Sequence, residues 1–278
     1  MEQEQYIQKH GSNIREIIHG GSTPSWDDPS ENYLQASKLS REGLAWETPM
    51  IPVLMQSEDL QRTTMRSSRR YDSRPFEPFE ATASTSDQLA SALRNRRSTR
   101  AFKQQSIEIE RLAAILENSY GAYRHHGGQL RRNSPSGGAL YPLDIFVVSR
   151  NVEGLALGGL YYFDPIRHGL TDFQMKVDEE TFLSALLLPQ EIQEVPLFLV
   201  ITASVWRCRF KYAQRALRFC CLEAGHLAQN ILTVATDMRL GTRLFGGFID
   251  DEITAILPDV NGVDDFPLYV IGIGEAND

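Results

Sequence analysis

The sequence predicts an α+β sandwich, and two observations support this fold class. Helical and strand-like segments are mixed along the chain without the strict alternation that a doubly wound parallel sheet requires. The chain has 278 residues, of which 42% are hydrophobic. This apolar content is enough to bury a core and too high for a disordered chain.

Residues 1–85 differ from the rest of the chain. They contain six prolines and little periodicity, with a short helix expected within 32–44. Residues 62–74 hold five arginines, which favours a solvated linker over a docking strip for an acidic partner. We therefore predict an N-terminal extension at 1–85, which contacts a partner or substrate, and a main domain at 86–278.

The main domain should open with two helices. Thr85 and Gln88 fit a capping box at the start of a helix that runs through residue 93, followed by a loop at 94–102. Ser106 is suited to cap a second helix. Five apolar or aromatic residues then follow helical spacing and should face the core: Ile109, Leu112, Ala113, Leu116 and Tyr120.

Four apolar, β-branched runs predict strands of a buried sheet. They lie at 144–149, 160–163, 197–203 and 268–273. A long helix is expected at 214–238, because an apolar stripe widened by small residues predicts burial over much of its circumference. Gly241 fits a stop signal for this helix. The acidic residues at 250–252 fit a helix start near Glu252, where acidic side chains favour the helix dipole.

Composition limits the function. The formal net charge of −8 and a pI near 5.3 argue against a nucleic-acid partner. No signal core and no apolar run of roughly 20 residues occur, so we expect a cytoplasmic protein with no membrane span. The three cysteines form no disulfide framework, and core packing is expected for Cys220 and Cys221. Adjacent His125 and His126 have no third ligand at metal spacing, so no metal site is expected.

Two clusters carry donors that suit a phosphate or a planar ligand. Residues 96–100 read Arg-Arg-Ser-Thr-Arg, which combines guanidinium forks with hydroxyls. An exposed basic loop is an equal alternative for this cluster. Residues 134–138 read Ser-Pro-Ser-Gly-Gly just ahead of a strand, and glycines let a backbone approach a ligand closely. A plain turn into the strand is the alternative.

Two further clusters flank the long helix. Lys211, Arg215 and Arg218 share a face if the helix begins by Lys211. Neighbouring positive charge and burial favour a neutral lysine, which can act as a general base. A helix start with solvent-directed cations is the preferred alternative on spacing alone. Gly246 and Gly247 would let backbone N–H groups lie against the edge of a flat ligand, or form a turn.

Taken together and in this order, the clusters resemble the nitroreductase-like flavoprotein superfamily. In detail they are similar to the azoline dehydrogenases of thiazole/oxazole-modified microcin and streptolysin S-type biosynthesis. The matching segments are 96–102, 131–142, 159–164, 210–212, 222–230, 246–248 and 272–278. The resemblance covers residues 86–278, with a looser match at 32–39.

This resemblance implies a central sheet flanked by helices, an intertwined homodimer, and FMN at the dimer interface. Each site residue is carried over from a matching motif. The FMN phosphate and ribityl chain would be held by Arg96, Ser98 and Arg100, with Arg97 as an additional contact. Pro135, Ser136, Gly137 and Gly138 would contact the flavin, and Gly246 and Gly247 would lie near its N5. The family's Lys-Tyr catalytic pair falls on Lys211 and Tyr212, which reverses the preference stated above for Lys211.

The implied activity is FMN-dependent oxidation of peptide thiazolines and oxazolines to thiazoles and oxazoles during maturation of a ribosomally made peptide. Lys211 would take the ring proton, and Tyr212 would assist proton transfer or orient the ring. The implied partners are cyclodehydratase subunits of a synthetase complex and the precursor peptide. Two alternatives remain: an NAD(P)H-dependent nitro or quinone reductase, and a non-catalytic scaffold subunit of the cyclodehydratase complex. The family often has glycine after Lys-Tyr, where this chain has Ala213.

Overall fold

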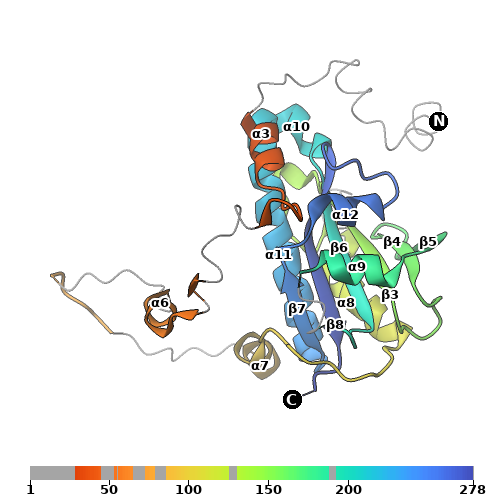
Figure 1. Ribbon diagram of the computed structural model, residues 1–278, viewed down its shortest axis with the longest axis horizontal. Helices are drawn as coiled ribbons and strands as arrows, with labels where there is room; N and C mark the ends of the chain where they lie inside the picture. The colour runs from red at the N-terminus through yellow and green to blue at the C-terminus, as the bar shows by residue number, and fades with distance from the viewer. Residues whose placement is uncertain are drawn as a thin grey trace.

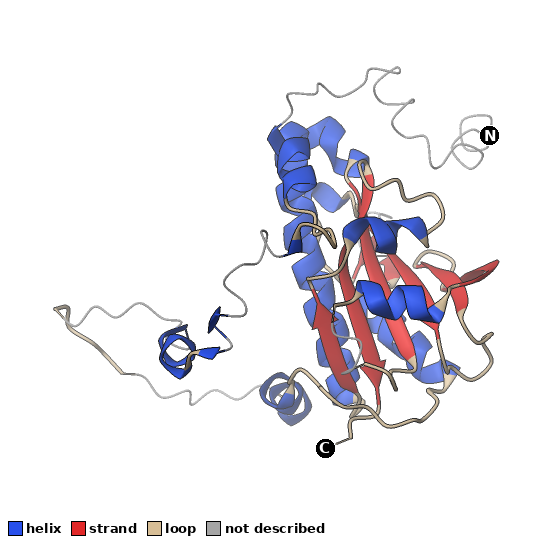
Figure 2. Ribbon diagram, viewed as in Figure 1, coloured by secondary structure: helices blue, strands red, loops and turns tan. Residues whose placement is uncertain are grey.

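The computed structural model describes residues 29–44, 53–54, 56–64, 73–78, 86–124, 130–187 and 192–277. Its centre is a six-stranded sheet with the order β5-β4-β3-β6-β8-β7, in which neighbouring strands are antiparallel (Figure 1). Helices lie on both faces of this sheet (Figure 2). The predicted α+β class is therefore confirmed.

The strands are β3 (Leu143–Ser149), β4 (Gly159–Asp164), β5 (Gly169–Lys176), β6 (Leu197–Ser204), β7 (Gly241–Phe245) and β8 (Asp265–Gly274), and a separate hairpin pairs β1 (Ala122–Arg124) with β2 (Leu130–Arg132). The helices are α3 (Pro29–Ala36), α6 (Glu58–Thr64), α7 (Asp87–Asn95), α8 (Ile109–Tyr120), α9 (Glu179–Ala185), α10 (Trp206–Tyr212), α11 (Ala216–Asp237) and α12 (Asp250–Ala255), with short 3-10 turns η2 (Gly137–Ala139) and η4 (Ala213–Arg215).

Strand β6 divides the interior into two cores. Its side chains alternate across the sheet, as the two-residue period of a strand requires. Leu199 and Ile201 face the core beneath α8 and α11, while Phe198 and Val200 face the core beneath α9 and α12. Because β6 is buried on both faces, its sequence is a continuous apolar run.

All four predicted strands exist, as β3, β4, β6 and β8. The sequence prediction missed β5, β7 and the β1–β2 hairpin. Strands β5 and β7 are the two edges of the sheet. Most residues of β5 are exposed, so it lacks the apolar run by which the other strands were recognised.

Both predicted helix starts need correction. Ser86, rather than Thr85, caps α7 by accepting a hydrogen bond from the Leu89 N–H, and Thr85 lies outside the described residues. Ser106 does not cap α8. Its hydroxyl donates to Glu153 at 2.7 Å, while Glu108 occupies the cap position without a side-chain hydrogen bond.

The long helix predicted at 214–238 is confirmed as α11, but Lys211 lies outside it. Residues 206–212 form the separate helix α10, and α11 starts only at Ala216, after the turn η4. At the other end, Arg239 takes the left-handed conformation with φ 60°, so Gly241 is not the stop signal. Gly241 instead begins β7, where a Cβ would lie 2.6 Å from the Thr99 hydroxyl. Here glycine is required by close packing.

Three smaller predictions have definite outcomes. Cys220 is buried as expected, but Cys221 is exposed on α11, which contradicts its predicted place in the core. Helix α12 begins at Asp250, two residues before the predicted Glu252, and its first turn carries the expected acidic residues. No helix among the described residues is long and apolar enough to span a membrane.

Candidate functional site

The Pro-Ser-Gly-Gly loop at residues 135–138 is held in place by a buried carboxylate of helix α11. Glu223 of α11 accepts hydrogen bonds from the Ser136 hydroxyl at 2.7 Å and from the Gly137 N–H at 2.9 Å. The same hydroxyl accepts from the Tyr141 N–H at 2.8 Å, which closes the loop on itself. Burial raises the pKa of Glu223, and these two hydrogen bonds offset only part of that increase. Groups of the protein itself thus hold the loop in place, so its conformation does not depend on a bound ligand.

Gly138 lies directly beside the predicted catalytic pair. It adopts φ +67°, and a Cβ at this position would lie 2.5 Å from the Lys211 Nζ and 2.6 Å from the Tyr212 hydroxyl. The left-handed conformation and the missing side chain both favour glycine here. The structure therefore brings together Gly138, Lys211 and Tyr212 from two distant parts of the sequence.

Helix α10 presents Lys211 because its other residues anchor it. Trp206 donates its ring N–H to Asp264, and Arg207 pairs with Asp144 of β3 at 2.6 Å. Arg209 is buried and pairs with Glu31 of α3. Lys211 itself is exposed, with its Nζ 5.2 Å from the centre of the Tyr212 ring. A firmly held helix thus ends in an accessible amine.

A sharp backbone turn follows the pair. Ala213 has φ 46° and ψ −132°, close to the first central position of a type II′ turn. Because helix α10 ends here, Arg215 lies in η4 and Arg218 in α11. The condition for a helical face shared with Lys211, a helix that begins by Lys211 and continues through Arg218, is therefore not met.

Phe219 supports both halves of this group. Its ring centre lies 4.6 Å from that of Tyr212, and a Cβ on Gly137 would meet the same ring at 3.4 Å. One aromatic side chain of α11 thus packs between the loop and Tyr212. The loop, the lysine and the tyrosine form a single cluster, which we call the Lys-Tyr pocket.

Residues 96–100, here called the arginine segment, lie away from the Lys-Tyr pocket, along the edge strand β7. Ser98 forms a parallel bridge with Thr242, and the Thr99 N–H donates to the Thr242 carbonyl at 2.8 Å. Ser98 and Arg100 are exposed, and Arg96 is half-buried. Arg97 differs from them, because it lines a separate polar cavity of about 820 Å³ between α7 and the end of α11.

Gly246 and Gly247 follow the other end of β7. Both are exposed, and a Cβ would come no closer than 3.4 Å to Tyr269 and 3.8 Å to Leu39, respectively. Neither has the positive φ that would demand glycine. The four residue steps from Thr242 to Gly246 span about 13 Å of extended chain, so this edge carries cationic donors at its start and an open backbone just past its end.

The arginine segment and the Lys-Tyr pocket are far apart within one chain. Helix α11 touches the pocket through Glu223, and its Asp237 lines the same cavity as Arg97. Asp237 lies fourteen residue steps after Glu223 in the helix, which corresponds to about 21 Å along the axis. The two groups of predicted residues therefore do not share one cavity in a single protomer.

Sequence reasoning missed Glu223 and Phe219. Glu223 left a readable signal, because it is a carboxylate next to the apolar stripe of a buried helix, where charged residues are rare unless paired. Phe219 left no such signal.

His125 and His126, which were considered for a metal site, lie outside the described residues. In the part of the chain that is described, no three His, Cys, Asp or Glu side chains are grouped so that they could hold a metal ion.

Comparison with known proteins identifies the family of the chain. The model of the nitroreductase family matches residues 93–275. A protein of Methanocaldococcus jannaschii that is named as a nitroreductase is 34% identical over 187 residues, which cover 67% of this chain and 90% of that relative. The microcin B17-processing protein McbC of Escherichia coli is 27% identical over 176 residues, which cover 62% of this chain and 64% of McbC.

Solved structures support the same fold. A chain of the E. coli microcin synthetase McbBCD complex, solved with truncated pro-MccB17 bound, matches with a TM-score of 0.60 and 21% identity. That match covers 91% of this chain and all of the other. A Ralstonia eutropha protein described as a nitroreductase matches with a TM-score of 0.53 and 24% identity, covering 73% of this chain and 88% of that one. The matched family model spans the sheet, the Lys-Tyr pocket and the β7 edge together, and the chain belongs to the nitroreductase family.

Proposed function

We propose that this protein is an FMN-dependent azoline dehydrogenase, which oxidises thiazolines and oxazolines of a ribosomally made peptide to thiazoles and oxazoles. The observation that carries the proposal is the position of the Lys211 amine and the Tyr212 hydroxyl beside the open backbone of Gly138. An oxidoreductase role agrees with family membership, and the similarity to McbC favours a microcin-type substrate.

The residues present fit a flavin. A flat ring needs backbone that it can approach closely, and Gly138, Gly246 and Gly247 are exposed and carry no side chain. A phosphate needs cationic and neutral donors, and Arg100 and Ser98 are exposed beside β7. Bound FMN would supply the two-electron acceptor that takes a hydride from the azoline ring.

The protein side chains would handle the proton. Conversion of an azoline to an azole removes a hydride and a proton, and the proton next to the carbonyl is the acidic one. The Lys211 amine would accept this proton as general base. Tyr212, with its ring packed on Phe219, would donate a hydrogen bond that orients the ring or assists the transfer. Glu223 would keep the loop opposite them in place.

A homodimer would complete the site. Because about 21 Å of α11 separates the Lys-Tyr pocket from the arginine segment, we infer that a second copy brings its arginine segment to the first copy's pocket. The outer face of α11 suits such a contact. Leu222 is 52% exposed, and a Cβ on Gly225 would meet nothing within 4 Å. Cyclodehydratase subunits and a precursor peptide are the proposed further partners, by analogy with the McbBCD complex.

A nitro or quinone reductase that uses NAD(P)H is the second candidate. It is favoured by the M. jannaschii relative, which is the more similar in sequence of the two relatives described above. Both candidates require bound flavin. They are separated by offering the purified protein NAD(P)H with a nitroaromatic acceptor, and separately an azoline-containing peptide. A colourless protein without flavin would instead favour a scaffold subunit.

Lys211→Ala tests the proposed mechanism. The variant should keep its flavin and fold, because Lys211 is exposed and flavin contacts lie in other segments. Azoline oxidation should fall by about 10²–10⁴-fold, and the peptide product should stay heavier by two hydrogens per unoxidised ring, as read by mass spectrometry. Lys211→Arg should fail as well, because a guanidinium stays protonated. Full oxidation by Lys211→Ala at the wild-type rate would rule Lys211 out as the base.

A further inference from the structure

Residues 29–44, here called the strap, run along the main domain although they precede it by more than forty residues. The strap starts on the helix that carries Lys211. Glu31 of α3 pairs with the buried Arg209, which lies two residues before Lys211. Leu34, one turn later, packs against the core beneath α11. The first half of the strap is therefore fixed to α10 and its surroundings.

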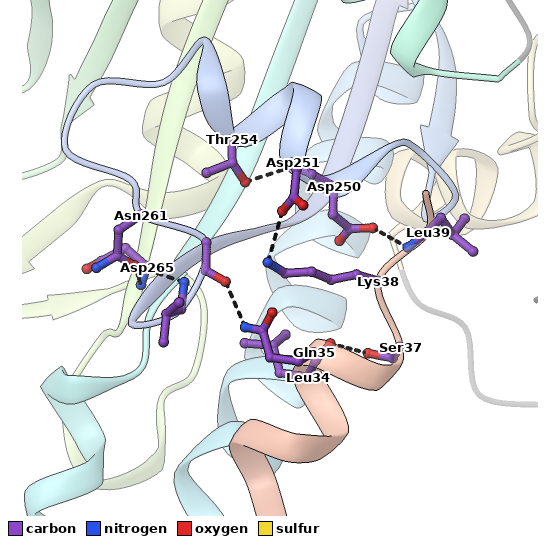
Figure 3. Close-up of polar contacts among 12 residues, drawn as sticks. Leu34, Gln35, Ser37, Lys38, Leu39, Asp250, Asp251, Thr254, Asn261 and Asp265 are labelled. Carbon is purple, nitrogen blue, oxygen red and sulfur yellow. Dashed lines mark hydrogen bonds and ion pairs between the residues drawn. The ribbon is translucent and has the colours of Figure 1, made fainter. Parts of the chain in front are cut away.

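The second half of the strap is held by α12 (Figure 3). The Leu39 N–H donates to the Asp250 carboxylate at 2.8 Å, and the Lys38 Nζ pairs with Asp251 at 3.0 Å. Arg41 completes the series through a 2.6 Å contact with Glu252. Each acidic residue of the first turn of α12 thus binds one residue of the strap.

Leu39 reaches the Gly-Gly turn. It forms a parallel bridge with Ile249, two residues after Gly247, and its Cδ1 lies 3.8 Å from where a Cβ on Gly247 would be. Glycines have the greatest backbone freedom of all residues, and a Gly-Gly pair offers no side chain through which packing could limit it. The neighbouring strap is therefore suited to restrict this turn.

The three acidic residues do not contribute equally. The Asp251 side chain is 81% exposed, and exposed ion pairs of this kind contribute little. Asp250 is half-buried and binds the backbone of the strap rather than a flexible side chain. Burial raises its pKa, while the Leu39 N–H opposes this. The Asp250 carboxylate is therefore the side-chain group whose loss should loosen Leu39, which keeps only the 3.4 Å hydrogen bond from the Asp250 N–H to its carbonyl and its bridge to Ile249.

We propose that the strap is a positioning element of the active site, with Asp250 as its anchor. It ties the helix that carries Lys211 to the turn that carries Gly246 and Gly247, so that the base and the flavin-facing backbone keep a fixed relation. The roles of these residues rest on the proposed function. The structural connection between α10 and this turn rests on the contacts of Glu31, Leu39 and Asp250.

The test compares Asp250→Ala with Asp251→Ala in the full chain. Both variants remove one negative charge from the first turn of α12, so they should lose similar helix stabilisation. Hydrogen exchange at Gly246 and Gly247 should rise at least tenfold in Asp250→Ala and less than twofold in Asp251→Ala. Hydrogen exchange at Lys211 and Tyr212 should also rise in Asp250→Ala, because the strap joins α10 to the turn that carries the two glycines. Asp250→Asn should restore protection, since its amide oxygen still accepts from Leu39.

Flavin and activity readouts complete the test. Asp250→Ala should weaken FMN binding and shift the visible FMN absorption band, while kcat for azoline oxidation falls more than KM rises. If the wild-type protein oxidises no azoline, the proposed function fails, but the exchange experiment still decides the strap. Equal exchange in the Asp250→Ala and Asp251→Ala variants would overturn the strap proposal, whatever the substrate proves to be.

Discussion

Replacing Gly138 by alanine should lower the activity of the protein far more than its stability. The added Cβ would lie 2.5 Å from the Lys211 Nζ and 2.6 Å from the Tyr212 hydroxyl. Normal contacts between such atoms are about 3.5–4.0 Å, so each tip must withdraw by about 1 Å. Both are ends of flexible side chains, so this movement is cheap for the fold. The left-handed backbone, φ +67°, adds about 1–2 kcal/mol of strain.

The effect on catalysis should be larger. A misplacement of about 1 Å can reduce a rate by about 10²-fold, and here two groups move at once. We therefore expect Gly138→Ala to lower the rate of azoline oxidation by about 10²-fold, while Tm falls by only about 2–8 °C. The assay is mass spectrometry of the peptide over time, together with thermal unfolding followed by circular dichroism.

Gly154→Ala is the matched control. Gly154 is also exposed and has φ +82°, but a Cβ there would meet only Ile109, at 3.9 Å. This variant should lose the same stability and keep full activity. If Gly138→Ala were folded and oxidised azolines as fast as Gly154→Ala, the contacts at Gly138 would be irrelevant to the reaction, and the Lys-Tyr pocket would not be the active site.

Three further predictions concern support, pH and assembly. Glu223→Ala should lower the free energy of unfolding by about 2–4 kcal/mol in urea titrations, because it leaves two donors of the loop unpaired, whereas Glu223→Gln should cost much less. Burial raises the pKa of Asp265 to about 6, so the folded state binds this proton more tightly than the unfolded chain. Stability should therefore fall by about 3 kcal/mol as the pH rises from about 4 to about 6, and Asp265→Asn should abolish that slope. Gly225→Trp should yield monomers in light scattering while Gly225→Ala stays dimeric; a dimeric tryptophan variant would exclude this face of α11 from the interface.

The sheet could be predicted where burial shapes the sequence. Strand β6 is buried on both faces and reads as one apolar run, so its position was clear from the sequence. Strand β5 lies at an edge with most residues exposed, and its polar sequence carries no comparable signal. Gly241 was misread because a glycine after a helix usually ends it, whereas here it makes room for Thr99.

The motifs of the candidate site could be recognised in the sequence, but their arrangement in space could not. Alanine is the best helix former, so the residue type itself does not indicate that the chain turns sharply at Ala213 and separates α10 from α11. The sign in the sequence is that the resembled family often has glycine at this position, which suits the positive φ found there. The approach of Lys211 to Gly138 depends on that turn and on the anchors of α10, which are long-range contacts. Local propensity cannot encode such contacts, and the strap on α12 escaped prediction for the same reason.

The strap also has a consequence for the order in which the protein matures. Asp251 is synthesised 213 residues after its partner Lys38. At about 5–20 residues per second, the strap waits roughly 10–40 s for its binding surface. During that interval α12 does not exist, and Gly246 and Gly247 have not been made. The contact between Lys38 and Asp251 therefore joins the earliest described part of the chain to a helix that is synthesised 213 residues later, so the second half of the strap docks only after α12 has been made.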